Sequence, residues 1–153
     1  MPTIGKPAPA FMLSTDSGDA VSLDDFKSKI VVLYFYPKDD TSSCTVEACE
    51  FRDSTPRFKK GKAVVLGVSP DTVKSHQKFK EKYKLNFTLL ADIDHAVAER
   101  YGVWQEKSLY GRAYMGVART TFLIDGQGVL RKVFEKVKSD GHADEVAEAI
   151  AAL

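Results

Sequence analysis

Short apolar runs alternate along this chain with segments in which apolar residues recur at helical spacing. The strongest run, residues 30–36 (Ile-Val-Val-Leu-Tyr-Phe-Tyr), is β-branched and aromatic throughout, which indicates a central strand buried on both faces. A second run, 63–68, predicts another buried strand. Between them, residues 46–60 predict a helix that Pro56 is expected to kink and that ends near Gly61. This β-α-β order predicts that the two strands are parallel neighbours.

The remaining elements complete the same architecture. We expect short strands at 11–13 and 21–23, a helix from Ser69-Pro70-Asp71 to Tyr83, a shorter helix at 94–101 capped by Gly102, and a hairpin of strands 120–124 and 129–134. The last helix has the clearest stripe, formed by Ala143, Val146, Ala147, Ile150 and Ala151. Together these elements predict an α/β sandwich, with a central mixed β-sheet flanked by helices, in one domain spanning residues 1–153.

Length and composition agree with one folded domain. The chain has 153 residues, 44% of them hydrophobic, which is enough to bury a core without disulfide or metal staples. Its 22 basic and 21 acidic residues are scattered, so no strong field draws nucleic acid or an anionic membrane. No apolar run is long enough to span a bilayer, and the first residues lack the apolar stretch of a signal peptide. We therefore expect a soluble, cytoplasmic protein.

The chemistry is concentrated in residues 37–49, which contain the only two cysteines, Cys44 and Cys49. This segment follows the predicted central strand, so Cys44 is expected in the first turn of a helix, just past the carboxyl end of that strand. Sites of open α/β sheets form at that edge. A helix N-terminus is also a place where a thiol can become a reactive thiolate. In a reducing compartment, a close cysteine pair is typical of catalysis, redox chemistry or metal binding.

A helix N-terminus alone cannot activate such a thiol. A free thiol has a pKa of about 8.5. Lowering such a pKa to about 6 requires roughly 3.4 kcal/mol, whereas a helix terminus contributes only about 0.3–1 kcal/mol. The charges of Asp39, Asp40 and Glu47 act in the opposite direction. Thr41 can offer a hydroxyl and the loop can offer N–H groups, and we expect a cation from a distant segment beside Cys44.

The spacing of the two cysteines predicts a conformational step. Cys49 follows Cys44 by five positions, which on an α-helix separates them by about 7.5 Å along the axis. A disulfide needs Cα atoms closer than roughly 7 Å. The two thiols can therefore react only if the first turns unwind, which predicts a folded form and a locally unfolded form. Such a pair suits a cycle that passes through a sulfenic acid.

Simpler interpretations of these residues stay open. Free cysteines are often small buried core residues, and Cys49 shares an apolar pattern with Val46. A zinc site is disfavoured because Cys-x4-Cys is not a usual ligand spacing and the histidines are scattered. We expect the three histidines and the single tryptophan to be structural or surface residues: His76, His95, His142 and Trp104.

Residues 34–53 (Tyr-Phe-Tyr-Pro-Lys-Asp-Asp-Thr-Ser-Ser-Cys-Thr-Val-Glu-Ala-Cys-Glu-Phe-Arg-Asp) closely resemble the active-site segment of the peroxiredoxins, in particular the bacterioferritin comigratory protein or peroxiredoxin Q subfamily. The resemblance covers essentially the whole chain, because residues 5–11 are similar to the family's N-terminal arm and 101–107 and 118–125 to its later landmarks. The Pro-x-x-x-Thr-x-x-Cys pattern with a late arginine is far more specific than a bare cysteine pair. It implies a thioredoxin-like fold and reduction of hydrogen peroxide and alkyl hydroperoxides, with no metal, haem or flavin cofactor.

The resemblance also implies a role for each cysteine. Cys44 corresponds to the peroxidatic cysteine, whose thiolate attacks the peroxide and becomes a sulfenic acid. Cys49 corresponds to the resolving cysteine of those members that form an intramolecular disulfide on one helix. A dithiol reductant such as thioredoxin would then regenerate the enzyme, which would act as a monomer or a weak homodimer.

Four further residues match the family pattern. Thr41 and Arg119 correspond to the residues that bind and polarise the peroxide, which would make Arg119 the missing cation. Pro37 would shield the site from water, and Glu47 would position Arg119. Each also has an ordinary interpretation: Arg119 as a surface residue, Thr41 as a helix cap and Pro37 as a strand terminator.

The chain departs from the family pattern at Ser42-Ser43, where many relatives have Pro-Gly. Serines can cap the helix and donate hydrogen bonds, so we expect the chemistry to survive while loop stiffness, and with it the folded–unfolded balance or the preferred reductant, changes. Two other functions use the same residues. One is a redox sensor or disulfide-relay partner, and the other is a general disulfide oxidoreductase, which the absence of a Cys-x-x-Cys motif disfavours.

Overall fold

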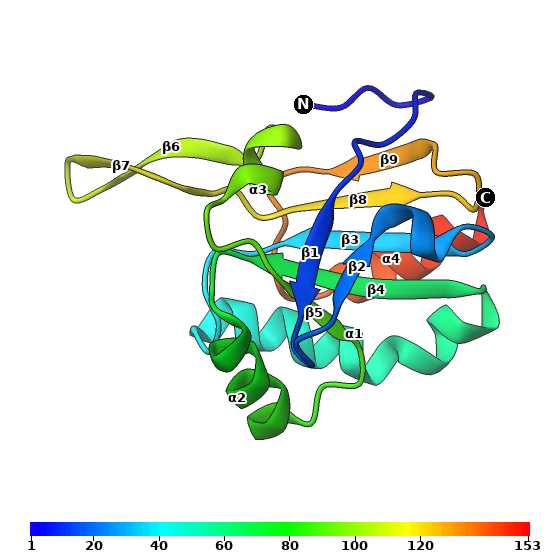
Figure 1. The fold of residues 1–153 in the computed structure, drawn as a ribbon, viewed down its shortest axis with the longest axis horizontal. Coiled ribbons are helices and arrows are strands. Elements are labelled where there is room, and N and C mark those ends of the chain that lie inside the picture. Colours follow the sequence, from blue (N-terminus) through cyan, green and yellow to red (C-terminus); the bar gives the residue numbers. More distant parts are fainter.

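The computed structural model describes all residues, Met1–Leu153, and has a seven-stranded mixed β-sheet at its centre (Figure 1). The strand order is β2-β1-β5-β4-β3-β8-β9. The strands are β1 (Met12–Thr15), β2 (Ala20–Ser22), β3 (Ile30–Phe35), β4 (Ala63–Ser69), β5 (Thr88–Ala91), β8 (Thr120–Ile124) and β9 (Leu130–Phe134). The helices are the 3-10 turn η1 (Leu23–Phe26), α1 (Ser42–Lys60), α2 (Val73–Tyr83), α3 (Ala96–Arg100) and α4 (His142–Ala151). Strands β6 (Trp104–Leu109) and β7 (Arg112–Val117) form a separate hairpin that projects from the body.

The central strand β3 is buried on both faces, as its sequence predicts. It pairs in parallel with β4 and antiparallel with β8. Val32 and Tyr34 point into one core, whereas Val31, Leu33 and Phe35 point into the core on the opposite face. Because successive strand residues face opposite sides, an uninterrupted apolar run is what two covered faces require.

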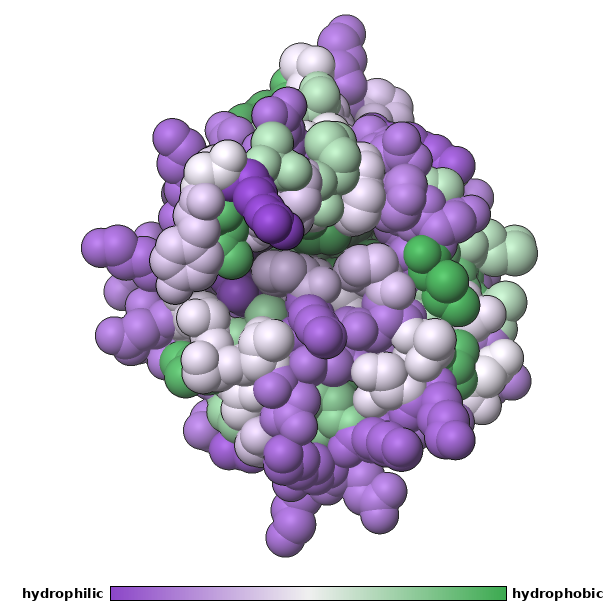
Figure 2. Space-filling view, turned by 90° about the vertical axis from the view of Figure 1, so that its left-hand side faces the viewer, coloured by the Kyte–Doolittle hydropathy of each residue, from purple (hydrophilic) through white to green (hydrophobic).

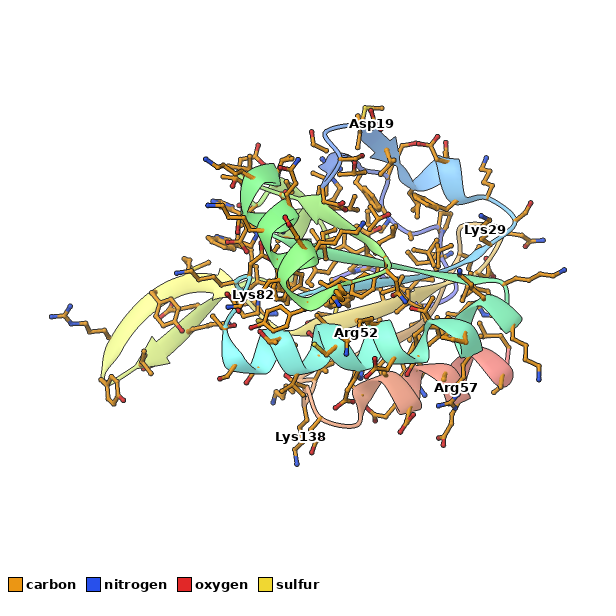
Figure 3. All side chains as sticks on the ribbon, turned by 90° about the horizontal axis from the view of Figure 1, so that it is seen from below. Asp19, Lys29, Arg52, Arg57, Lys82 and Lys138 are labelled. Carbon is orange, nitrogen blue, oxygen red and sulfur yellow. The ribbon has the colours of Figure 1, made fainter.

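Helices cover both faces of the sheet, which confirms the predicted sandwich. Helices α1 and α4 run side by side on one face (Figures 1 and 3). The stripe of α4 is buried there, except for Ala151, which is exposed at the end of the helix. Helix α3 lies on the other side and adds Val97 and Ala98 to the second core. No helix is both long and apolar enough to cross a bilayer.

Helix α1 begins at Ser42, four residues before the apolar pattern that starts at residue 46, so Cys44 lies in its first turn as expected. The chain stays helical on both sides of Pro56. Proline has no N–H to donate to the carbonyl of Arg52, four residues earlier. The side-chain Nδ2 of Asn86 donates to that carbonyl instead, at 3.2 Å. A tertiary hydrogen bond therefore replaces the missing helical one.

Other boundaries shift by a few residues, and three strands were not predicted. Helix α2 begins at Val73 rather than at residues 69–71. Its N-cap is Thr72, whose hydroxyl accepts from the N–H of Ser75 at 3.1 Å. The predicted hairpin is present as β8 and β9, and the strand expected at 21–23 pairs back on β1 as β2. Strands β5, β6 and β7 have no counterpart in the predicted elements.

Candidate active site

The candidate site lies where β3 ends and α1 begins. Phe35 ends the strand, residues 36–41 form a loop, and Cys44 is in the first turn of α1 with only 1% of its surface exposed. The N-cap of α1 is Thr41, with extended backbone angles of −89° and 156°. Its hydroxyl does not cap the helix but donates to the carbonyl of Lys38 at 3.0 Å. The predicted contact of Thr41 with a peroxide therefore stays a prediction.

Sheet topology brings Arg119 to this same point. Strand β8 runs antiparallel to β3 and pairs Thr120 with Phe35, so the start of β8 lies beside the end of β3. Arg119 immediately precedes β8. Its Nη2 donates to the Sγ of Cys44 at 3.2 Å, and its Nη1 donates to Oε1 of Glu47 at 2.6 Å. A cation from a distant segment thus contacts Cys44, as the sequence argument requires.

Glu47 and Arg119 form a nearly solvent-free ion pair. Their side chains are 1% and 14% exposed. Burial would lower the pKa of Arg119, but the charges of Glu47 and Cys44 outweigh it and raise that pKa above its ordinary value, so Arg119 stays a cation. Burial raises the pKa of Glu47 to about 7, against the opposing pull of Arg119. The second carboxylate oxygen of Glu47, Oε2, has no hydrogen-bond partner.

The second cysteine lies further along the same continuous helix. Cys49 is partly buried, and neither it nor Cys44 forms a disulfide. With α1 intact from Ser42 onward, the structure corresponds to the folded form of the two predicted ones. Pro37 lies in the loop before α1 and is partly buried.

Two aspartates fasten the loop before α1 to helix α2, and the sequence patterns did not predict this. Asp39 is buried, and its carboxylate accepts hydrogen bonds from Tyr36 Oη (2.6 Å) and Ser75 Oγ (2.7 Å). The exposed Asp40 accepts from Lys82 Nζ at 2.7 Å and Tyr83 Oη at 2.6 Å, and these two hydrogen bonds lower its pKa. Figure 3 shows Lys82 close to the beginning of α1.

His76 is buried and also binds Asp39 in the loop before α1. Its Nδ1 lies 2.8 Å from Asp39 Oδ2 and its Nε2 lies 2.9 Å from the carbonyl of Leu90. A carbonyl can only accept, so Nε2 carries a proton and donates to Leu90. Asp39 and His76 also lie close to Asp71, and the three could be taken for metal ligands. However, Asp71 Oδ2 already accepts from the Asp39 N–H (2.8 Å) and from the hydroxyl of Ser69 (2.6 Å). Protein hydrogen bonds therefore account for this cluster.

The other expected structural or surface residues also have ordinary surroundings. His142 is buried, with Nε2 2.7 Å from the hydroxyl of Thr121 and Nδ1 3.0 Å from Glu145. Burial lowers the pKa of His142. His95 stacks on Trp104 with ring centroids 3.9 Å apart.

A shallow depression leads to the site from solvent. Its volume is about 460 Å³, and its walls are α1, Arg119 and the segment before α4. The lining residues are Ser42, Ser43, Val46, Arg119 and residues 137–140. Figure 3 shows Lys138 directed outward beside the start of α4. The side of the molecule on which α1 begins is mostly hydrophilic and is hollowed near its centre (Figure 2).

Comparison with known proteins identifies similar chains over almost the whole length. The model of the AhpC/TSA family matches residues 4–133. Peroxiredoxin Bcp of Bacillus subtilis is 51% identical over 150 residues, covering 98% of this chain and 94% of the relative. Peroxiredoxin Bcp of Escherichia coli is 46% identical over 142 residues, covering 93% and 91%.

Solved structures agree with these sequence matches. A crystal structure of a PrxQ variant from Xylella fastidiosa superposes with a TM-score of 0.93 at 35% identity, covering 98% of this chain and 96% of that one. A structure of the bacterioferritin comigratory protein of Xanthomonas campestris superposes with a TM-score of 0.89 at 39% identity, covering 93% of this chain and 90% of that one. That structure was described in a study of alkyl peroxide reduction by that protein. The thioredoxin-like arrangement expected from the sequence is therefore the arrangement of these structures.

Proposed function

We propose a two-cysteine peroxidase cycle for this chain. The chain belongs to the AhpC/TSA family, as a peroxiredoxin of the bacterioferritin comigratory protein or peroxiredoxin Q group, and it is a thiol peroxidase. The observation that carries the proposal is the hydrogen bond from Arg119 to the buried sulfur of Cys44. A cation that donates to sulfur favours the thiolate, and the thiolate is the nucleophile of thiol chemistry.

In the first step, the Cys44 thiolate attacks the terminal, OH-bearing oxygen of a hydroperoxide. A sulfur–oxygen bond forms, the oxygen–oxygen bond breaks, and the departing oxygen leaves with the electron pair and takes up a proton. Cys44 becomes a sulfenic acid, and the peroxide is reduced to water or an alcohol. Arg119 supplies positive charge where negative charge moves from sulfur to oxygen. In this proposal Thr41 binds the peroxide together with Arg119, Pro37 shields the site from water, and Glu47 holds Arg119 in place.

In the second step, the first turns of α1 unwind and the Cys49 thiol attacks the sulfenic acid. A disulfide forms between Cys44 and Cys49, and water leaves. A dithiol reductant of the thioredoxin type then reduces the disulfide by exchange. We propose that the 153 residues act as one domain in the cytoplasm, as a monomer or a weak homodimer, with hydrogen peroxide and alkyl hydroperoxides as substrates.

The cycle is tested by following peroxide consumption with thioredoxin and its reductase in the native protein, Cys44→Ser and Cys49→Ser. We expect turnover by the native protein, no reaction by Cys44→Ser, and one equivalent of peroxide consumed by Cys49→Ser before it stalls. Thr45→Ser, a change on the same turn that removes one methyl group, is the matched control and should turn over at the native rate.

Two results would contradict the cycle. Full turnover by Cys49→Ser would show that the reductant attacks the sulfenic acid directly, which removes the proposed role of Cys49. Stoichiometric oxidation of the native protein without turnover would instead indicate a redox sensor that passes its disulfide to another protein.

A further inference from the structure

Lys107 reaches back along the β6–β7 hairpin toward the candidate site. It lies on β6 opposite Tyr114, and its side chain is partly buried. A Cβ at Gly116 would lie 3.3 Å from Cδ and 3.6 Å from Cε of Lys107. The stem of Lys107 therefore runs over Gly116, two residues nearer the base of the hairpin. From there β7 leads through Ala118 to Arg119.

The ammonium of Lys107 has no counter-ion. It takes part in none of the ion pairs or side-chain hydrogen bonds of the structure, whereas Lys80 and Lys82 pair with Asp16 and Asp40. A partly buried lysine packs its stem against the protein and keeps its ammonium in contact with water. Lys107 therefore presents a positive charge that no carboxylate neutralises, directed toward the base of the hairpin.

Lys107 interacts electrostatically with the two groups at the centre of the site. Burial lowers its pKa, the charge of Arg119 lowers it further, and Cys44 raises it. The effect of Cys44 is the attraction expected between a thiolate and a nearby ammonium. The stem over Gly116 directs the ammonium toward the base of the hairpin, which Arg119 follows in the chain, and the interactions with Arg119 and Cys44 agree with that direction.

The ion pair within the site explains why a second cation matters. Arg119 gives one hydrogen bond to Cys44 and another, at 2.6 Å, to Glu47. When Glu47 is ionised, the pair carries no net charge, so Arg119 acts on the sulfur mainly through its directed hydrogen bond. An unpaired lysine adds positive charge that no carboxylate cancels.

We propose that Lys107 is a positioning residue that stabilises the Cys44 thiolate through space, as a second cation beside Arg119. The proposal rests on the peroxidase function for its consequence, which is a faster first attack on peroxide. It requires no bond between Lys107 and the substrate.

The test uses a Cys49→Ser background, in which Cys44 is the only thiol. Lys107→Met removes the charge and keeps the stem over Gly116, and Lys107→Arg restores a charge. Arg112→Gln is the matched control, because it removes a cation from the exposed end of the same hairpin. Two rates are measured across pH: alkylation of Cys44 by iodoacetamide, which needs no peroxide, and single-turnover oxidation by hydrogen peroxide.

We expect both pH profiles of Lys107→Met to move to higher pH, with rates on the rising limb lower by about three- to tenfold, which corresponds to a displacement of half to one pH unit. Lys107→Arg and Arg112→Gln should retain the profile of the background protein. Circular dichroism and thermal midpoints verify folding, and Lys107→Gln is the second neutral variant if methionine disturbs the hairpin.

Each alternative outcome has a defined meaning. An unchanged profile in folded Lys107→Met and Lys107→Gln would overturn the role of Lys107 and leave the peroxidase function intact. Failure of folded Lys107→Arg to restore the profile would show that the stem matters rather than the charge, and would also overturn it. Displaced alkylation in a protein that does not react with peroxide would contradict the proposed function while supporting the effect of Lys107 on Cys44.

Discussion

Glu47→Gln is the substitution that most directly probes the electrostatics of the site. The carboxyl of Glu47 is 1% exposed, and Oε1 accepts from Arg119 at 2.6 Å while Oε2 has no partner. Glutamine keeps the shape and an acceptor oxygen for Arg119. It removes the charge and the ability to titrate between pH 4 and pH 8.

The magnitude follows from the pKa of Glu47, which burial raises from the ordinary 4.5 to about 7. Between these two values the folded protein keeps a proton that the unfolded chain has released, so stability falls as pH rises. Above pH 7 the charge is buried, and the native protein has lost about 3 kcal/mol relative to pH 4 because of this group alone. Below pH 4.5 the carboxyl is protonated in both the folded and the unfolded state, so stability no longer changes with pH because of this group.

The assay is urea unfolding of the native protein and Glu47→Gln between pH 4 and pH 8, under reducing conditions. Titrating groups that do not interact with Glu47 contribute equally to both proteins and cancel in the difference. We expect the difference in the free energy of unfolding, Glu47→Gln minus native protein, to rise by about 3 kcal/mol between pH 4 and pH 8. Parallel curves would refute the reasoning. A difference of the opposite sign would show that the attraction of Arg119 exceeds the cost of burial.

Two further substitutions test the surroundings of the site by urea unfolding. Tyr34→Phe removes a buried hydroxyl that has no partner, so we expect unchanged stability or a gain of about 1 kcal/mol. A loss of that size would show that the hydroxyl is hydrogen-bonded. His76→Phe removes the hydrogen bonds of His76 to Asp39 and to the carbonyl of Leu90, although Asp39 keeps Tyr36 and Ser75 as donors, so we expect a loss of about 2 kcal/mol. A loss below about 1 kcal/mol would mean that the loop before α1 does not depend on this anchor.

The sequence predicts those elements whose burial follows a regular period. Strand β3 is apolar at every position because both of its faces are covered, and α4 carries a stripe because one face is. Strand β5 has only four residues, and its place between β4 and β1 depends on pairing with distant segments. The hairpin of β6 and β7 is largely exposed on both faces, so no apolar alternation marks it. Its turn has positive φ at Tyr110 and Gly111, where Asn-Gly would have been the recognisable pair.

The sequence predicts the reactive centre of the candidate site, but it does not predict the residues that hold the surrounding loop and hairpin in place. Cys44 is marked by its position after β3, and the need for a distant cation follows from the size of the helix-terminus effect. The resemblance to the peroxiredoxins then points to Arg119, and the antiparallel pairing of β8 with β3 brings that residue into contact. The anchors between Asp39 and His76, and the course of Lys107 over Gly116, join segments that no local pattern relates.

The tertiary contacts of α1 differ between its first turns and the rest of the helix. In the first turns, Cys44 and Glu47 both bond to the single residue Arg119. From Phe51 onward the helix is fixed, since the ring of Phe51 stacks on Tyr34 at 4.6 Å and Arg52 Nη1 donates to the carbonyl of Tyr83 at 2.6 Å. Oxidation of Cys44 to a sulfenic acid removes the thiolate charge that Arg119 binds. The proposed chemical step therefore weakens one of the contacts that hold the first turns, which favours the proposed unwinding.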